Sequence, residues 1–129
     1  MESWIPFEKG KYLAEAAYLV AENGDAVTLE KVIVEVYQDP RGVRRMKGSG
    51  FAQNVLVVAL LEEGDAIDVL LDMGGPYTLR LPEPDIRGGK MFTPDVRAIF
   101  QFTPNEAGRF LSREEFEALC SDLHLLSDT

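Results

Sequence analysis

Four basic residues form the first group in this sequence that could do chemistry. Arg41, Arg44, Arg45 and Lys47 lie within seven residues, and no acidic residue separates them. An arginine side chain presents a planar fork of hydrogen-bond donors that matches the oxygens of a phosphate group. These residues are therefore candidate ligands for a phosphate-bearing small molecule. The alternative is a solvated edge strand, whose basic side chains discourage pairing with another sheet.

Five acidic residues form the second candidate group. They lie within eleven residues that contain no basic residue, and they are Glu62, Glu63, Asp65, Asp68 and Asp72. Their spacing does not match a calcium-binding loop, so we predict no metal site here and no cofactor elsewhere. We expect either a solvated hairpin face or a docking surface for a basic protein partner.

Nucleophilic chemistry has little support. Cys120 and His124 are the only cysteine and histidine, and they could share one face of a helix. Cys120 also lies on a predicted apolar stripe, where a shielded core thiol is expected. Ser49 lacks the flanking glycine spacing of a nucleophile elbow. We predict no catalytic residue, and the sequence leaves enzymatic activity uncertain while favouring a non-catalytic protein.

Size and charge limit the kinds of partner. The 129 residues fit a single domain, spanning residues 1–129, that can bury a core without disulfides. A net charge of −9 disfavours nucleic acid, because the phosphate backbone would be repelled. The longest apolar run, residues 55–61, is too short to cross a bilayer, and the first residues lack a signal-peptide pattern. We therefore expect a cytoplasmic protein that does not contact a membrane. The sequence does not indicate whether the protein is a monomer or an oligomer.

The first half of the chain predicts strands joined by tight turns. Residues 11–37 suggest a hairpin centred on a type I′ turn at Asn23-Gly24, with alternating valines in its second arm. The first arm contains four alanines and could instead be a helix, although we favour a strand. Residues 39–42 fit a type I turn, and 43–47 a short strand. The glycines at 48 and 50 suggest another reversal.

The second half predicts further strands and one long loop. Residues 55–61 are apolar throughout, which favours a central strand covered on both sides. Residues 67–72, 77–81 and 96–102 alternate between apolar and polar side chains, as half-exposed strands do. The connection over 82–95 contains three prolines and two glycines, and a loop of that length is often either mobile or functional.

The strongest local signal is a helix near the C-terminus. Ser112 and Glu115 have the spacing of a capping box, and Leu111 and Phe116 that of a hydrophobic staple. An apolar stripe follows, formed by Phe116, Leu119, Cys120, Leu123 and Leu126. We also expect one helical turn at residues 103–106.

Together these patterns predict a mainly β (α+β) protein. We expect an antiparallel barrel or sandwich of six to eight strands over about residues 11–102, followed by an amphipathic helix over about residues 112–126. Two functions are consistent with this architecture. The first is a non-catalytic acidic module that binds a basic protein, as an inhibitor, an immunity-type protein or an adaptor does. The second is a small β-barrel that binds a small molecule near the 82–95 loop.

Overall fold

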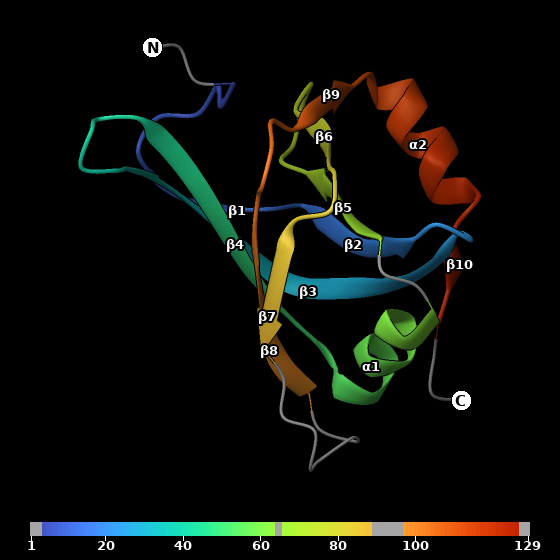
Figure 1. The fold of residues 1–129 in the computed structure, drawn as a ribbon. Coiled ribbons are helices and arrows are strands. Elements are labelled where there is room, and N and C mark those ends of the chain that lie inside the picture. Colours follow the sequence, from blue (N-terminus) through green and yellow to red (C-terminus); the bar gives the residue numbers. More distant parts are fainter. Residues whose placement is uncertain (1–3, 64–65, 89–96, 127–129) are drawn as a thin grey trace.

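The computed structural model describes residues 4–63, 66–88 and 97–126, and Figure 1 shows how their elements are arranged. These residues form ten strands and two helices. In chain order the elements are β1 (Gly10–Leu13), β2 (Ala16–Ala21), β3 (Asp25–Gln38), β4 (Arg44–Gln53), α1 (Asn54–Glu63), β5 (Ile67–Asp72), β6 (Thr78–Leu81), β7 (Asp85–Gly88), β8 (Arg97–Thr103), β9 (Arg109–Leu111), α2 (Arg113–Ser121) and β10 (His124–Leu125).

The strands form one curled sheet, a half-barrel. Eight of them follow one another in the order β7-β8-β4-β3-β2-β5-β6-β9, and β1 and β10 pair with further parts of β3. Among the described strands every pairing is antiparallel except that of β10 with β3. The predicted class, mainly β with a helix near the C-terminus, is confirmed. The strand number exceeds the expected six to eight because strands as short as β10 carry no readable period of two.

Strand β3 is shared by two halves of the sheet. Its residues up to Leu29 pair with β2, whereas residues 33–36 pair with both β1 and β4. The register shifts between Glu30 and Ile33, where Lys31 has a φ of 52° and bends the strand. We call β1, β4, β7, β8 and β3 from residue 30 the β4 half. We call β2, β5, β6, β9, β10 and β3 up to residue 29 the β5 half.

The concave side of the sheet holds the main hydrophobic core. Both halves contribute to it, for example through Leu19 in β2, Val34 in β3 and Phe102 in β8. Helix α1 adds Val57 and Leu60, which are fully buried. The helix therefore lies on the concave side, below β3 in Figure 1, and closes the core from that direction.

Helix α1 occupies the segment for which the sequence predicts a central strand, residues 55–61, and that prediction is wrong. The run is apolar on every side, so its periodicity does not distinguish a helix from a buried strand. In the helix, Val57 and Leu60 are three residues apart and face the core together, while Val55 and Leu61 stay partly exposed. The leucines and the alanine of this run also have good helix propensity.

The predicted reversal at Gly48 and Gly50 is also wrong, because both glycines lie inside β4. A Cβ atom at Gly48 would lie 2.1 Å from Cζ of Phe102, and one at Gly50 would lie 2.7 Å from a methyl carbon of Val32. The glycines therefore allow large core side chains to approach the strand backbone closely. Close approach and chain reversal both favour glycine, and the sequence alone does not separate them.

Helix α2 covers the convex side of the β5 half. The predicted capping box is present: Ser112 accepts from the Glu115 amide, and the Glu115 side chain accepts from the Ser112 amide. Phe116 packs with Val20, Ala26 and Leu70 in a second apolar cluster. The helix ends at Ser121, earlier than the predicted residue 126, because the chain then turns to pair β10 with the start of β3. Neither described helix has the length and apolar character needed to cross a membrane.

The remaining turns and loops follow the sequence in part. The predicted 11–37 hairpin is confirmed, with β1 and β2 both extended, but its turn is not type I′: only Gly24 has a positive φ, and its amide donates to the Ala21 carbonyl. The predicted turn at 39–42 is confirmed by a 2.8 Å hydrogen bond from Gly42 to Asp39. Part of the predicted 82–95 loop forms β7, and residues 89–96 lie outside the described residues. Residues 103–106 form no helical turn.

Phe116 tests how α2 packs on the sheet, because it is the residue of the helix that lies in the second apolar cluster. We call this cluster, which contains Val20, Ala26, Leu70 and Phe116, the convex cluster. Phe116→Ala should lower the free energy of unfolding by about 3–5 kcal/mol, because it leaves a cavity between helix and sheet. Glu117→Ala, on the exposed face of the same helix, should change it by roughly 0.5 kcal/mol or less. Urea denaturation measures both variants. Equal effects would mean that α2 is not anchored through Phe116.

Candidate functional site

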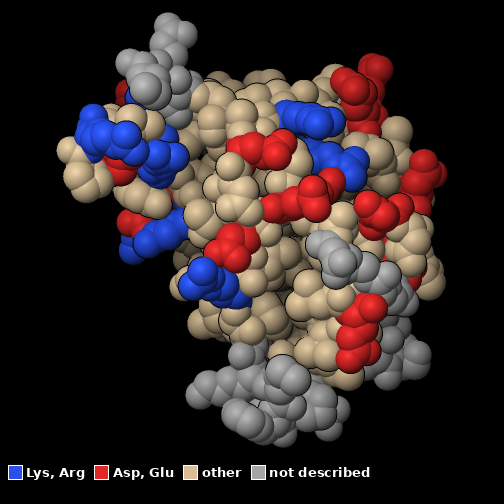
Figure 2. All heavy atoms as spheres, viewed as in Figure 1, with Lys and Arg blue, Asp and Glu red and all other residues tan. Residues whose placement is uncertain are grey.

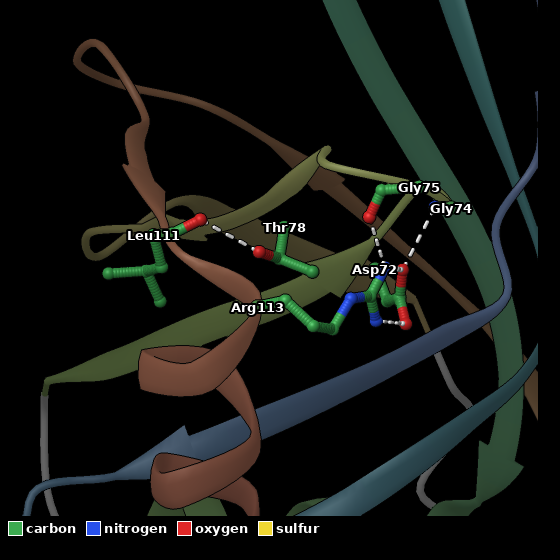
Figure 3. A network of polar contacts seen from close by, with 6 residues as sticks. All are labelled: Asp72, Gly74, Gly75, Thr78, Leu111 and Arg113. Carbon is green, nitrogen blue, oxygen red and sulfur yellow. Dashed lines mark hydrogen bonds and ion pairs between the residues drawn. The ribbon is translucent and has the colours of Figure 1, made fainter.

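A partly buried ion pair joins the predicted acidic group to α2. Asp72, at the end of β5, is 8% exposed, and both of its carboxylate oxygens accept from the Arg113 guanidinium, at 2.6 and 3.1 Å. Arg113 also donates to the Gly75 carbonyl, and the Gly74 amide donates to Asp72 (Figure 3). Thr78 adds a bond to the Leu111 carbonyl. This network fixes the start of α2 to the β5–β6 hairpin.

The network changes the ionisation of Asp72. Burial alone would raise the pKa of this carboxyl group, but the hydrogen bonds from Arg113 and the Gly74 amide, together with the Arg113 charge, leave the pKa below its ordinary value of 3.8. The hydrogen bond to Asp72 raises the pKa of Arg113, and the charges of Asp72, Glu117 and Glu15 act in the same direction. Asp72 is therefore an ionised structural group, not the exposed acid that the sequence suggests.

Asp68 is neutralised in a similar way. Its carboxylate accepts from the Arg80 guanidinium at 2.6 Å and from the Glu83 amide at 2.9 Å. Arg80 lies on the neighbouring strand β6, twelve residues along the chain. Strand pairing thus supplies a base that is absent from the local sequence.

The other three predicted acids lie elsewhere. Glu62 and Glu63 are in the last turn of α1, on the concave side, and Asp65 lies outside the described residues. The last turn of α1 contains no basic residue, so the exposed Glu62 lies at the negative end of the helix dipole without local compensation. The structure therefore does not bring the predicted acids together on one face. A contact between Glu62 or Glu63 and a partner stays a prediction.

A different set of carboxylates does gather, around the start of α2. Glu15, Glu114 and Glu117 are exposed, and Glu15 and Glu117 both lie close enough to Arg113 to affect its pKa. Arg113 is engaged by Asp72 and Gly75, so its charge is directed inward. We call Glu15, Glu114 and Glu117 the acidic face. The sequence offered only a weak signal for it, because Glu15 is about a hundred residues from the helix.

The four predicted basic residues lie on the β3–β4 hairpin but do not converge. Arg44 donates to the Ile5 carbonyl at 3.0 Å. Arg45 pairs with Asp39 at 3.1 Å, and Lys47 pairs with Glu35 at 3.5 Å and lies over the Tyr37 ring. Arg41 is exposed at the hairpin tip. The acidic partners come from the neighbouring strand and turn, so a stretch of sequence without acids is not an uncompensated surface.

Two of these arginines do line a cavity. Arg44 and Arg45 form part of the wall of a pocket of about 470 Å³, and Trp4, Tyr37, Thr103 and Asn105 form other parts. The Asn105 side chain donates to the Glu83 carbonyl at 3.0 Å, which ties this wall to the start of the predicted 82–95 loop. The pocket thus combines guanidinium, amide and aromatic groups with one acidic residue, Glu106, beside the start of the predicted 82–95 loop.

Charge is separated between the two halves of the sheet. Among the described strands, those of the β4 half carry seven basic residues and three acidic ones, namely Lys11, Lys31, Arg44, Arg45, Lys47, Arg87 and Arg97 against Glu30, Glu35 and Asp85. The β5 half with α2 carries six acidic and three basic residues, namely Asp25, Asp68, Asp72, Glu114, Glu115 and Glu117 against Arg80, Arg109 and Arg113. Figure 2 shows basic groups at the left and near the top, and acidic groups along the right and across the middle.

Cys120 and His124 do not form a pair. Cys120 packs against the convex cluster, where burial raises the pKa of its thiol and the charges of Asp72 and Glu117 raise it further. His124 lies in β10, and its Nδ1 is 2.9 Å from Asp25. The described residues include no group of three or more His, Cys, Asp or Glu side chains placed to hold a metal ion.

Comparison with known proteins leaves the chain without an assigned family. No family model, curated protein or solved structure matches it.

The Asp72–Arg113 pair predicts a pH-dependent stability. Asp72→Asn should lower the free energy of unfolding at pH 7 by about 1–2 kcal/mol, because it weakens charge-assisted hydrogen bonds to a partly exposed arginine. A carboxyl group with a lowered pKa in the folded state stabilises the protein above its unfolded pKa and loses that effect as the pH falls through the folded value. The gap between wild type and variant should therefore be full at pH 6–7 and shrink below about pH 4.

The exposed pair Arg87–Asp85 provides the control, since both side chains are largely accessible. Asp85→Asn should have almost no effect on unfolding at any of these pH values. Chemical denaturation at a series of pH values measures both variants. A gap that stays constant down to pH 2 would contradict the assigned role of Asp72.

Proposed function

We propose that this protein is a non-catalytic binding module that acts in the cytoplasm and holds a basic protein partner on its acidic face. An inhibitor, an immunity-type protein or an adaptor would work in this way. The observation that carries the proposal is the separation of charge between the two halves of the sheet. A net charge of −9 spread evenly would favour solubility alone, whereas a charge gathered on one side also orients a partner.

The acidic face has the properties that such a role needs. Glu15, Glu114 and Glu117 are exposed, and the nearest base, Arg113, is already bonded to Asp72 and Gly75. Two of its three residues, Glu114 and Glu117, lie on helix α2, which is fixed by its capping box and by the buried Phe116. Binding to a rigid surface avoids part of the entropy that ordering a flexible one would cost.

The test compares two double variants that change net charge equally. Glu114→Gln with Glu117→Gln alters the acidic face, whereas Glu35→Gln with Asp85→Asn alters the β4 half. The tagged wild type is first used to isolate a stoichiometric basic protein from extracts of the source organism. Surface plasmon resonance then measures association between the purified proteins as salt increases.

We expect the on-rate for the wild type to fall steeply as ionic strength rises past about 0.15 M, where the Debye length is about 8 Å. The acidic-face variant should associate about ten-fold more slowly at low salt, and the β4-half variant should behave like the wild type. Recovery of no basic partner, or equal effects of the two variants, would contradict the proposal.

The pocket beside Arg44 and Arg45 favours a second candidate function. In this alternative the half-barrel binds a phosphate-bearing small molecule between the β3–β4 hairpin and residues 103–107. Its volume of about 470 Å³ lies within the usual range for small-molecule sites. Two guanidinium groups and the Asn105 amide could then serve as donors to phosphate oxygens.

Titration with AMP or inorganic pyrophosphate tests this alternative, with amide chemical shifts as the readout. The shifts should change at residues 44–46 and 103–107, and Arg44→Gln with Arg45→Gln should weaken binding about ten-fold or more. Arg87→Gln, which alters an exposed arginine elsewhere on the β4 half, should leave the affinity unchanged. Shifts spread over all basic residues would indicate non-specific attraction and would count against a site.

A further inference from the structure

The convex side of the β4 half carries a strip of exposed apolar residues. Side chains alternate along these strands, so that Val34, Met46 and Phe102 point into the core while their neighbours point outward. Three outward residues are large and apolar: Leu13 in β1 is 72% exposed, Ile33 in β3 is 46% exposed and Ile99 in β8 is 52% exposed.

Strand register makes this strip continuous. Leu13 lies opposite Ile33 in the β1–β3 pair, and Ile33 lies opposite Ser49 in β4. Phe51, two residues from Ser49 on the same face, lies opposite Ile99 in β8. Directly opposed side chains in a sheet are close neighbours, so the strip crosses four adjacent strands. We call Leu13, Ile33, Phe51 and Ile99 the apolar strip.

A groove lined by two lysines and one glutamate lies beside the strip. It has a volume of about 290 Å³ and is lined by Lys11, Ile33, Glu35, Lys47, Ser49 and Gln101. Lys11 and Lys47 lie on the two strands that flank β3, with Glu35 between them. The strands of this half carry seven basic and three acidic residues, so basic residues are in excess around the groove in a chain of net charge −9. Four of these bases form ion pairs, namely Arg45, Lys47, Arg87 and Arg97.

The same molecule shows how such a face is covered. On the β5 half, α2 places Phe116 against Val20, Ala26 and Leu70 and directs Glu114 and Glu117 outward. On the β4 half, the exposures of Leu13, Ile33 and Ile99 show that no described element does the same. Scattered apolar residues are normal on a protein surface, whereas a continuous strip marks an interaction site.

We propose that the apolar strip and its groove bind an amphipathic helix of an acidic partner protein. The apolar stripe of that helix would cover Leu13, Ile33 and Ile99, and its carboxylates would meet Lys11 and Lys47. The excess of basic residues around the strip indicates which partner it binds. A second copy of this chain packed face to face would oppose two positive surfaces, and a basic helix would be repelled in the same way. This surface is distinct from the acidic face, so the inference does not depend on the proposed function.

Three synthetic helical peptides of about 18 residues, long enough to form a helix in isolation, test the inference. The first has a leucine stripe flanked by glutamates, the second has lysines in place of the glutamates, and the third has the composition of the first in scrambled order. Each is titrated into the full ¹⁵N-labelled chain, and amide chemical shifts report both affinity and location.

The first peptide should bind about ten-fold or more tightly than the other two, and its shifts should map to β1, β4 and β8. Leu13→Ser with Ile99→Thr should reduce that affinity about ten-fold or more, since apolar contact supplies much of the binding energy. Leu125→Ser, at a residue that is 50% exposed on β10, is the matched control and should leave binding unchanged. The spectrum of each variant alone verifies that it is folded.

Other outcomes would overturn the inference. Preferential binding of the lysine peptide would show that the partner is not acidic. Equal binding of the scrambled peptide would show that an amphipathic helix is not required. Shifts that map to α2 would place the contact on the wrong half of the molecule. Unchanged affinity in the Leu13 and Ile99 double variant, with the fold intact, would show that the strip does not take part.

Discussion

The backbone hydrogen bonds of β3 hold this fold together. This one strand pairs with β2 and β10 near its start and with β1 and β4 after the bend at Lys31. Because the same strand continues on both sides of the bend, the two halves of the sheet share one core while their convex faces carry separate surfaces. One of these faces is covered by α2, and no described element covers the other. The two convex faces therefore differ in charge, because the β4 half is richer in basic residues and the β5 half with α2 is richer in acidic ones.

Several signals that involve neighbouring residues predicted the structure correctly, whereas the type I′ turn at residues 23–24 and the helical turn at 103–106 are not formed. The capping box at Ser112, the turn at residues 39–42 and the valine alternation of β3 each depend on residues a few positions apart, and each is present in the fold. Signals with two physical causes were misread. An apolar run suits a buried helix as well as a buried strand, so α1 was predicted as a strand. Glycine permits close approach as well as reversal, so Gly48 was predicted in a turn.

The candidate sites show the same limit more strongly. The partners of Asp68, Asp72 and Lys47 lie on other elements, up to 41 residues away in sequence, and only the pairing of those elements brings them together. An acidic or basic stretch in the sequence therefore says little about the free charge on the folded surface. The surfaces that remain are the acidic face and the apolar strip, and each combines residues from more than one element.

The pairing of β10 with β3 has a consequence for synthesis of the chain. It joins residues 99 positions apart, since His124 contacts Asp25. During translation, the edge of β3 at Asp25 and Ala26 has no strand to pair with until Leu125 has left the ribosome. Such an edge can pair with another chain in the meantime, and long-range contacts of this kind also slow folding. This pairing must therefore wait until β10 has been synthesised, and a chaperone that shields this edge would be most effective before then.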